Sequence, residues 1–522
     1  MKRNRTLFLV TIVLLFSLLS VLILTVSAQD RDNFIVVRPQ EIVSLDPAIV
    51  TESQSGFIVR NVYSRLVDLS YDGNVIEADL AESWDISDDG LVYTFRLRPD
   101  VKFHDGSVLQ ASDVAYSMGR FLSIGEGDAS TFSSHISPDS VVAIDELTVQ
   151  FTLNEPFSAF LQLLGMPRGA SVVSQAWVEA NATAEDPWAT EYLAMNAMGS
   201  GPYEFVEWIP SEYARMVRFD DYYGGAAAVE EVISMINEDD TSTRLMIERG
   251  EVDMVERLPE DTLRALEDNS DLVIYRRPLS SSVFWVFQTQ LAPFDDVRVR
   301  QAMIHAIDYQ ALIDGLVQDG GFLMNSPVYA DMQYHNADIA LPTHDVELSR
   351  SLLSEAGYAD GLDIELVYVD FGLLKQVVVV LQANLADAGI NATLVEQPFG
   401  PFLDAAGAGE IGFYSWVSEP NYPQAIAILE RFQSSFMDMG LGGNISYYSN
   451  PEYDAAIEQI QSTTDEAELT DLYNSAQQML IDDAVWMLLY QEQLARVAGD
   501  WVEGFDHGVY NYLDMRDISV NH

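Results

Sequence analysis

Runs in which hydrophobic and polar residues alternate predict strands at several places in the chain. Residues 93–98 alternate apolar and polar side chains behind a turn, which is typical of a strand with one buried face. The runs 141–144 and 147–153 flank an acidic turn and predict a hairpin that ends before Pro156, because proline cannot continue a ladder. The apolar run 484–490 predicts a buried strand.

Other segments have the helical period. Apolar residues at Val299, Met303 and Ala306 form one stripe behind the acidic pair 295–296, which can cap a helix. A second stripe over 469–480 predicts another helix. Because strands and amphipathic helices both occur along the chain, we expect an α/β or α+β architecture. Its length of 522 residues predicts two or three packed units.

The N-terminal segment has the layout of a signal peptide. Basic residues within 2–5 precede an apolar run over 7–26, and small residues follow up to Ala28. We therefore expect a signal peptide over residues 1–28 that is cleaved after Ala28. An alternative stays open, because an apolar run of this length can also remain as an uncleaved membrane anchor. Both alternatives place the rest of the chain outside the cytoplasm, in the periplasm or at the cell surface.

The composition is strongly acidic and contains no cysteine. The chain has 81 acidic and 27 basic residues, which gives a formal net charge of −54. Such a surface repels nucleic acid and anionic lipid. It suits a protein adapted to salty water, although an acidic lineage without salt adaptation stays an alternative. The lack of cysteine excludes disulfides, thiolate metal sites, thiol nucleophiles and lipid attachment through a cysteine.

No motif in the sequence predicts catalysis, a cofactor or a metal. A G-x-G-x-x-G pattern occurs at 407–412, but a predicted helix precedes it and a predicted strand follows it, the reverse of the dinucleotide-binding order. A calcium-like start at 85–90 lacks the required glutamate, because Arg96 occupies the twelfth position. The chain has no helically spaced histidine pair and no G-x-S-x-G sequence. Its many carboxylates leave a pair of acidic residues for hydrolysis open.

Nine short segments of distinctive sequence follow one another along the chain. They are SLDP at 44–47, LAESW at 80–84, YTFRLR at 93–98, VKFHDG at 101–106, ASDVAYS at 111–117, GSGPY at 199–203, GEVD at 250–253, PFDDVRVRQA at 293–302 and NPEYD at 450–454. Together they resemble family 5 of the solute-binding proteins of ABC importers, which includes dipeptide-, oligopeptide- and nickel-binding proteins. The resemblance covers essentially the whole chain after the leader.

The resemblance implies an α/β, two-lobed periplasmic-binding-protein fold of type II, cluster C-like, with an extra inserted domain. The expected division is 29–60, 191–285 and 486–522 for lobe I, 61–190 for the inserted α+β domain and 286–485 for lobe II. Such proteins close around a ligand by a hinge motion at the segments that cross between the lobes. Residues 284–287 are expected to be one such crossing strand.

By the same resemblance, residues 416–423 match the segment in which oligopeptide binders hold the α-ammonium group of the ligand. Glu419 stands where an aspartate is usual, three residues after Trp416. A buried carboxylate that faces an ammonium group forms a charge-assisted hydrogen bond of roughly 1.5–3 kcal/mol. Two alternatives stay open: Glu419 as a solvated loop acid, and Trp416 as an ordinary core residue.

The resemblance implies further ligand contacts in three segments, 51–53, 280–282 and 416–417. Extended peptides pair their backbone with flanking strands of the binder, so the side-chain selectivity of such sites is loose. The chain departs from the family at Gln288, because relatives usually carry asparagine before the following threonine. The expected ligand-binding residues are Thr51, Glu52, Ser53, Ser281, Trp285, Trp416, Val417 and Glu419.

We therefore expect a monomeric, non-enzymatic protein without cofactor or metal that captures a small peptide and delivers it to an ABC permease and ATPase complex in the membrane. A second hypothesis keeps this fold but replaces the peptide with an oligosaccharide, an opine or a metal chelate, and Tyr414, Trp416 and Tyr422 would then supply aromatic surfaces. A third hypothesis is an extracellular hydrolase that uses two carboxyl groups.

Overall fold

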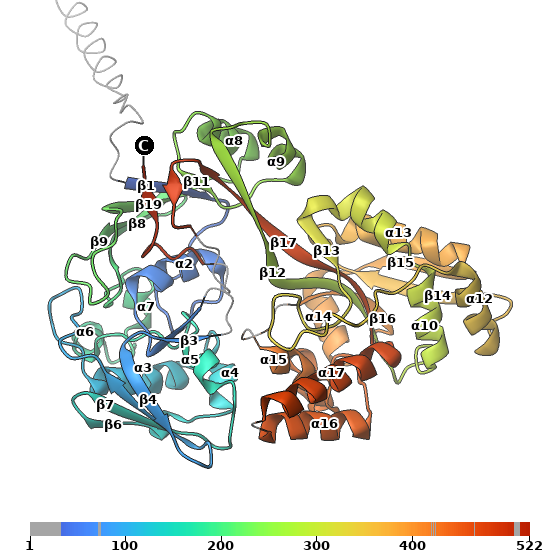
Figure 1. Ribbon diagram of the computed structural model, residues 1–522, viewed down its shortest axis with the longest axis horizontal. Helices are drawn as coiled ribbons and strands as arrows, with labels where there is room; N and C mark the ends of the chain where they lie inside the picture. The colour runs from blue at the N-terminus through green and yellow to red at the C-terminus, as the bar shows by residue number, and fades with distance from the viewer. Residues whose placement is uncertain are drawn as a thin grey trace, which may run out of the picture.

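The structure is a computed structural model that describes residues 33–70, 75–418, 420, 422, 424–463, 465–505 and 512–521. Figure 1 shows two bodies joined by two long strands, β12 (Leu272–Phe287) and β17 (Trp486–Gly499). The expected signal peptide, residues 1–28, lies outside the described residues. Within the described part of the chain, no helix combines the length and the apolar character needed to cross a membrane.

A single 11-stranded sheet runs through both bodies. Its order is β15-β14-β16-β12-β17-β11-β1-β10-β9-β8, and β13 (Gly321–Leu323) also pairs with β17. β12 and β17 are antiparallel, and their pairing runs from Leu272 opposite Gly499 to Val286 opposite Trp486. One end of this pair belongs to the first body and the other end to the second body, so the two strands form a connection between the bodies (Figure 1).

In the first body, the sheet is built around β1 (Asn33–Arg38), which lies parallel to both β10 and β11. Arg38 Nη2 and Arg496 Nη2 lie 2.9 and 3.5 Å from Glu256 Oε1, and all three side chains are buried. These ion pairs tie β1 to the crossing strand β17. The other elements here are β8 (Tyr203–Ile209), β9 (Tyr213–Arg218), β10 (Glu231–Ile236), β11 (Met254–Val255), β18 (Val502–Glu503), β19 (Ser519–Val520), α2 (Ser53–Val62), α8 (Asp240–Glu248) and α9 (Glu260–Leu266).

The first body also contains a separate four-stranded sheet of order β4-β5-β7-β6, which confirms the predicted strand at 93–98 and the predicted hairpin at 141–153. Arg120 of α3 donates hydrogen bonds of 2.8 and 2.5 Å to the two carboxylate oxygens of Asp46, and both side chains are buried. The helices and strands of this part of the first body are β2 (Val67–Leu69), β3 (Ile76–Ala78), β4 (Ala81–Ile86), β5 (Val92–Leu97), β6 (Val141–Asp145), β7 (Thr148–Thr152), α3 (Ala111–Ile124), α4 (Ala129–Ser133), η1 (Pro138–Ser140), α5 (Phe160–Leu164), α6 (Gln175–Asn181) and α7 (Thr190–Leu193).

In the second body, β14 (Leu362–Tyr368) lies parallel to β15 (Ile390–Glu396) and β16 (Phe413–Ser418). The two predicted helices are confirmed as α10 (Val297–Ala306), which is capped by the Asp296 carboxylate, and α17 (Glu466–Asp482). The other helices are α11 (Tyr309–Leu312), η2 (Ile313–Val317), η3 (Gln318–Gly320), α12 (Val346–Glu355), α13 (Leu374–Asp387), α14 (Phe399–Gly407), α15 (Ala425–Leu429), η4 (Glu430–Phe432), η5 (Ser434–Gly442) and α16 (Pro451–Ser462).

The glycine pattern at 407–412 and the apolar run 484–490 both lie at the ends of strands of the large sheet. The glycine pattern at 407–412 lies between α14 and β16, so it is a helix-to-strand turn as expected. Residues 486–490 of the apolar run 484–490 form the first part of β17, which confirms a buried strand there. The expected boundary at 285/286 falls inside β12 and the one at 485/486 immediately precedes β17, while the division into domains itself stays a prediction.

Candidate ligand-binding site

The ladder between the two crossing strands is interrupted at the joint between the bodies. Pro278 pairs with Gln493 and Ser282 with Gln491, so the three residues 279–281 lie opposite the single residue Glu492. The pairing of β12 with β16 begins only at Ser282, which leaves 279–281 without a ladder partner on either side. A bulge of this kind bends a strand and takes backbone groups out of the sheet.

Side chains hold this bulge in place. Ser281 Oγ donates a 2.6 Å hydrogen bond to Glu492 Oε2, and Gln491 Nε2 donates one of 2.8 Å to the carbonyl of Leu279. The hydroxyl of Ser280 is buried and has no hydrogen-bond partner among the described residues. An unmade hydrogen bond at a buried hydroxyl is costly, so this oxygen is a candidate contact for a bound group.

Three of the expected contact residues lie on neighbouring strands here. Ser282 pairs with Ser418 and Val283 with Val417, which brings Ser281 close to the end of β16. Trp416 and Val417 are half-buried. Tyr329 Oη, at 3.1 Å from Ser282 Oγ, donates a 2.6 Å hydrogen bond to the carbonyl of Ser418. The ends of β12 and β16 therefore form one polar edge beside the bulge.

Trp285 is placed differently from the other expected contacts. Its ring is fully buried in the core of the second body, with an exposed fraction of 0%. Its Nε1 atom has no hydrogen-bond partner in the described part of the chain. In this arrangement Trp285 supports the strand from within, and its contact with a ligand stays a prediction.

The expected contacts at 51–53 lie in the other body, at the beginning of α2. Glu52 caps this helix, because its carboxylate accepts a 3.1 Å hydrogen bond from the backbone N–H of Ser55. The carbonyl of Thr51 accepts a hydrogen bond from Arg168, and that of Ser53 accepts one from Arg38. In Figure 1, α2 and β16 lie on opposite sides of the space between the bodies. The predicted contact residues thus come from both bodies.

Glu419 lies outside the described residues, so its position in the fold stays a prediction. Its neighbour Tyr422 is described and is almost fully buried. The Tyr422 ring meets the ring of Phe157 edge to face, with centroids 5.7 Å apart and an interplanar angle of 89°. Because Phe157 belongs to the first body and Tyr422 to the second, this pair is a direct contact between the bodies.

The half-buried side chain of Glu430 contacts this tyrosine. Tyr422 Oη donates a 3.2 Å hydrogen bond to Glu430 Oε1. Burial raises the pKa of Glu430 to about 7, against the effects of the Tyr422 hydrogen bond and the nearby Arg431 guanidinium, and the negative charge of Glu155 in the first body raises it further. The protonation state of Glu430 is therefore sensitive to how the two bodies approach each other.

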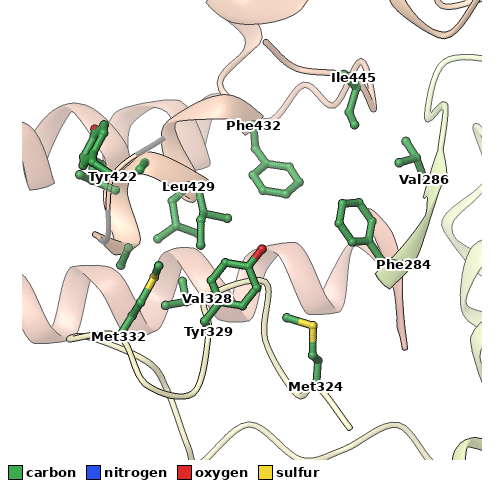
Figure 2. Packing of buried hydrophobic residues seen from close by; sticks show 14 of the residues in the cluster. Phe284, Val286, Met324, Val328, Tyr329, Met332, Tyr422, Leu429, Phe432 and Ile445 are labelled. Carbon is green, nitrogen blue, oxygen red and sulfur yellow. The ribbon is translucent and has the colours of Figure 1, made fainter. Parts of the chain in front are cut away.

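A small pocket lies next to the end of β16. Figure 2 shows two of its residues, Phe432 and Ile445, together with the core residues Phe284 and Tyr329 nearby. Phe432 and Phe284 both pack against Trp486, whose indole N–H donates a 2.8 Å hydrogen bond to Ser446. The lining residues are Ser418, Arg431, Phe432, Leu441, Gly443, Asn444, Ile445, Ser446 and Trp486.

No sequence pattern predicted a role in this region for Arg431, Glu430 or Tyr329. A signal for Arg431 was nevertheless present, because it is the only lysine or arginine between Lys375 and Arg496. No such signal marked Tyr329, since its role depends on a hydrogen bond to Ser418, which is 89 residues away in the chain. Among the described residues, no group of three or more His, Cys, Asp or Glu side chains could hold a metal ion.

Two bodies joined by crossing strands, with a second small sheet in one of them, define the two-lobed α/β fold of periplasmic binding proteins. The structure of HbpA2 from Haemophilus parasuis shares this fold, with a TM-score of 0.86 at 24% identity over 94% of this chain and 100% of that one. The fold class expected from the sequence is therefore confirmed.

The sequence also matches the profile for the middle region of the bacterial extracellular solute-binding proteins, family 5, over residues 75–439. The chain belongs to this family, which confirms the resemblance noted above. The probable D,D-dipeptide-binding periplasmic protein DdpA of Escherichia coli K12 is 29% identical over 502 residues, or 95% of each chain. DppA from Helicobacter pylori, solved in complex with the peptide STSA, has a TM-score of 0.77 at 25% identity and covers 95% of this chain and 99% of that one.

Proposed function

We propose that this chain is the extracytoplasmic solute-binding component of an ABC importer, which captures peptides between its two bodies and delivers them to a membrane permease and its ATPase. The observation that carries this proposal is the interrupted ladder at 279–281, which lies at the joint between the bodies. An extended peptide binds by adding its backbone to strand edges that the protein's own sheet leaves unused. The peptide-binding names of the relatives DdpA and DppA support the same ligand class.

The proposed contacts follow from this arrangement. The peptide backbone pairs with Ser281 and with the end of β16 at Trp416 and Val417, while residues 51–53 approach it from the first body. Glu419 binds the α-ammonium group, and Trp285 completes the site from the core side. The hinge lies in β12 and β17, because these are the strands that both bodies share.

The proposal includes the location and organisation of the chain. Residues 1–28 form a cleaved signal peptide, and the mature protein acts as a monomer outside the cytoplasm. Lobe I consists of 29–60, 191–285 and 486–522, the inserted domain of 61–190, and lobe II of 286–485. The description of the family as extracellular supports this location.

A non-peptide solute is the second candidate, and the aromatic residues near the joint argue against it. Sugar-binding sites present open aromatic faces, for which Tyr414, Trp416 and Tyr422 were the candidates. Tyr414 and Tyr422 are only 1% and 3% exposed, and Tyr414 Oη donates its hydrogen bond to the carbonyl of Ile445. Of these three aromatic residues, Trp416 is half-buried and the two tyrosines are buried. This arrangement supports a peptide over an oligosaccharide.

A thermal-shift panel tests the proposed function. Di- to pentapeptides are compared with oligosaccharides, opines and metal chelates on the purified mature protein. A ligand that binds only the folded state stabilises it by about 2.7 kcal/mol at a hundredfold excess over its Kd, so a cognate solute raises the melting temperature visibly. We expect the shift with peptides. A shift with sugars or chelates and none with any peptide would overturn the peptide assignment.

A further inference from the structure

The contact between Phe157 and Tyr422 brings two acidic residues toward each other across the joint. Glu155 lies two residues before Phe157 in the first body and is exposed. In the second body, Glu430 accepts the 3.2 Å hydrogen bond that Tyr422 Oη donates. When the two rings meet, the negative charge of Glu155 acts on the carboxyl group of Glu430. Like charges that approach each other in a partly desolvated place repel.

Both sides of this contact are held within their own bodies. Phe157 is buried and lies flat on His135, with centroids 3.8 Å apart and an interplanar angle of 7°. Tyr422 is also buried, and Glu430 begins η4 directly after the buried Leu429. Because the rings are fixed from behind, a new charge at Glu430 is not relieved by the rotation of a free side chain. It acts instead on the separation of the bodies.

The other groups that interact with this contact keep their charge between about pH 5 and 8. Arg431 stays positive, as guanidinium groups do in proteins. Burial lowers the pKa of His135 to about 4, so the imidazole behind Phe157 is neutral in this range. Burial also raises the pKa of the three tyrosine hydroxyl groups that interact with Glu430, which therefore stay neutral. They are Tyr422, Tyr453 and Tyr473.

The carboxyl group of Glu430 does change its charge in this range. Burial raises its pKa to about 7, against the Tyr422 hydrogen bond and the Arg431 guanidinium, and the charge of Glu155 raises it further. Separation of the bodies removes Glu155 and Phe157 from this place and admits water, which lowers the pKa of Glu430 again. The arrangement with the bodies in contact therefore holds a proton that the separated arrangement releases.

We propose that Glu430 is a proton-dependent switch between the two bodies. With a protonated carboxyl group, the contact between Tyr422 and Phe157 holds the bodies together, and with an ionised one, repulsion from Glu155 drives them apart. The switch goes beyond peptide capture and does not depend on the identity of the solute. Closure and proton binding favour each other, so acidic solution favours the closed arrangement.

The size of the effect follows from the same linkage. For each unit by which closure raises the pKa of Glu430, the ratio of closed to open molecules changes about tenfold between acidic and alkaline solution. A solute that binds the closed arrangement should accordingly bind more tightly in acidic solution.

Small-angle X-ray scattering of the protein without solute, at about pH 5 and about pH 8, tests the switch. Sodium chloride at about 0.5 M screens the repulsion between distant surface charges at both pH values. The radius of gyration of wild type should be larger at the higher pH. In Glu430→Gln, which stays neutral, this increase should disappear. In Glu155→Gln it should become smaller, because the repelling charge is removed.

Two exposed acids provide matched controls. Glu146→Gln in the first body and Glu410→Gln in the second body should retain the wild-type increase. Glu155 is itself exposed, so its variant tests the switch even if Glu430→Gln fails to fold. Equal radii of wild type at the two pH values would overturn the switch. An increase that Glu155→Gln and Glu430→Gln retain in full would overturn its assignment to this pair.

Discussion

The carboxyl group of Glu430 accepts a hydrogen bond from Tyr422, the tyrosine that contacts the first body. Burial raises its pKa from 4.5 to about 7, so the folded chain keeps a proton that the unfolded chain releases at lower pH. The contribution of the protonated carboxyl group to the free energy of unfolding is fully present below pH 4.5. It decreases as the pH rises from 4.5 to about 7 and is lost above that pH. Glu430 therefore destabilises the fold in neutral and alkaline solution.

Replacement of Glu430 by glutamine removes this titration while keeping a similar shape. Between about pH 5 and 8, the free energy of unfolding of Glu430→Gln should decrease less than that of wild type, as measured by urea denaturation. Glu410→Gln, which changes an exposed acid, is the control. Parallel pH profiles of wild type and Glu430→Gln would contradict the raised pKa.

The proposed ammonium anchor gives a second prediction for a single residue. Glu419→Gln should weaken the binding of peptides with a free N-terminus by about tenfold or more, because the charged ammonium group then loses the negative charge that it faces. N-acetylated peptides lack the ammonium group, so their affinities should change little. Calorimetry of both peptide forms provides the measurement. An unchanged affinity for free-N-terminus peptides would remove Glu419 from the mechanism.

Single residues of the site were predictable only where a local sequence identifies them. Trp416 and Ser281 were named from a family resemblance, and the structure places them on neighbouring strands at the joint. The role of Tyr329 could not be named, because its hydrogen bonds to Ser282 and Ser418 arise only when distant segments fold together. Burial, which places Trp285 in the core, is likewise a property of the packed molecule.

Among the elements, the contact between Phe157 and Tyr422 joins two segments that belong to different bodies. Phe157 stacks on His135 with centroids 3.8 Å apart, so its ring is fixed within the first body before it meets Tyr422. An edge-to-face aromatic pair contributes about 0.5–1.5 kcal/mol beyond the area that it buries. The contact therefore favours the arrangement in which the bodies approach each other.

Phe157→Leu should shift the protein toward a more open arrangement. Without peptide, its radius of gyration in small-angle X-ray scattering should exceed that of wild type, and its affinity for a bound peptide should fall about two- to tenfold. Phe132→Leu is the control, because it removes a ring contact with Phe121 within the first body alone. An unchanged radius of gyration and affinity would show that the contact does not influence closure.

Elements with a regular local pattern were predicted well, and those that depend on distant pairing were not. Helices α10 and α17 and the β6–β7 hairpin follow from periodicity because their patterns lie within short windows. The 16-residue length of β12 and its bulge at 279–281 depend on pairing with β17, more than 200 residues later in the chain. Local periodicity contains no information about such a partner.

The net charge of −54 predicts that the stability of the protein depends strongly on salt. Self-repulsion destabilises the compact state, and the Debye length falls from about 30 Å at 0.01 M salt to about 3 Å at 1 M. The melting temperature should therefore rise over this range of sodium chloride, as measured by scanning calorimetry. A constant or falling melting temperature would show that surface repulsion does not limit stability.

Capture of a peptide between the two bodies can be tested by native mass spectrometry of the mature protein with an equimolar pool of short peptides. We expect a one-to-one complex whose added mass equals that of a peptide, and with it a more compact distribution of charge states. A spectrum without any peptide adduct, from a protein that forms such a complex with an oligosaccharide or a metal chelate, would contradict it.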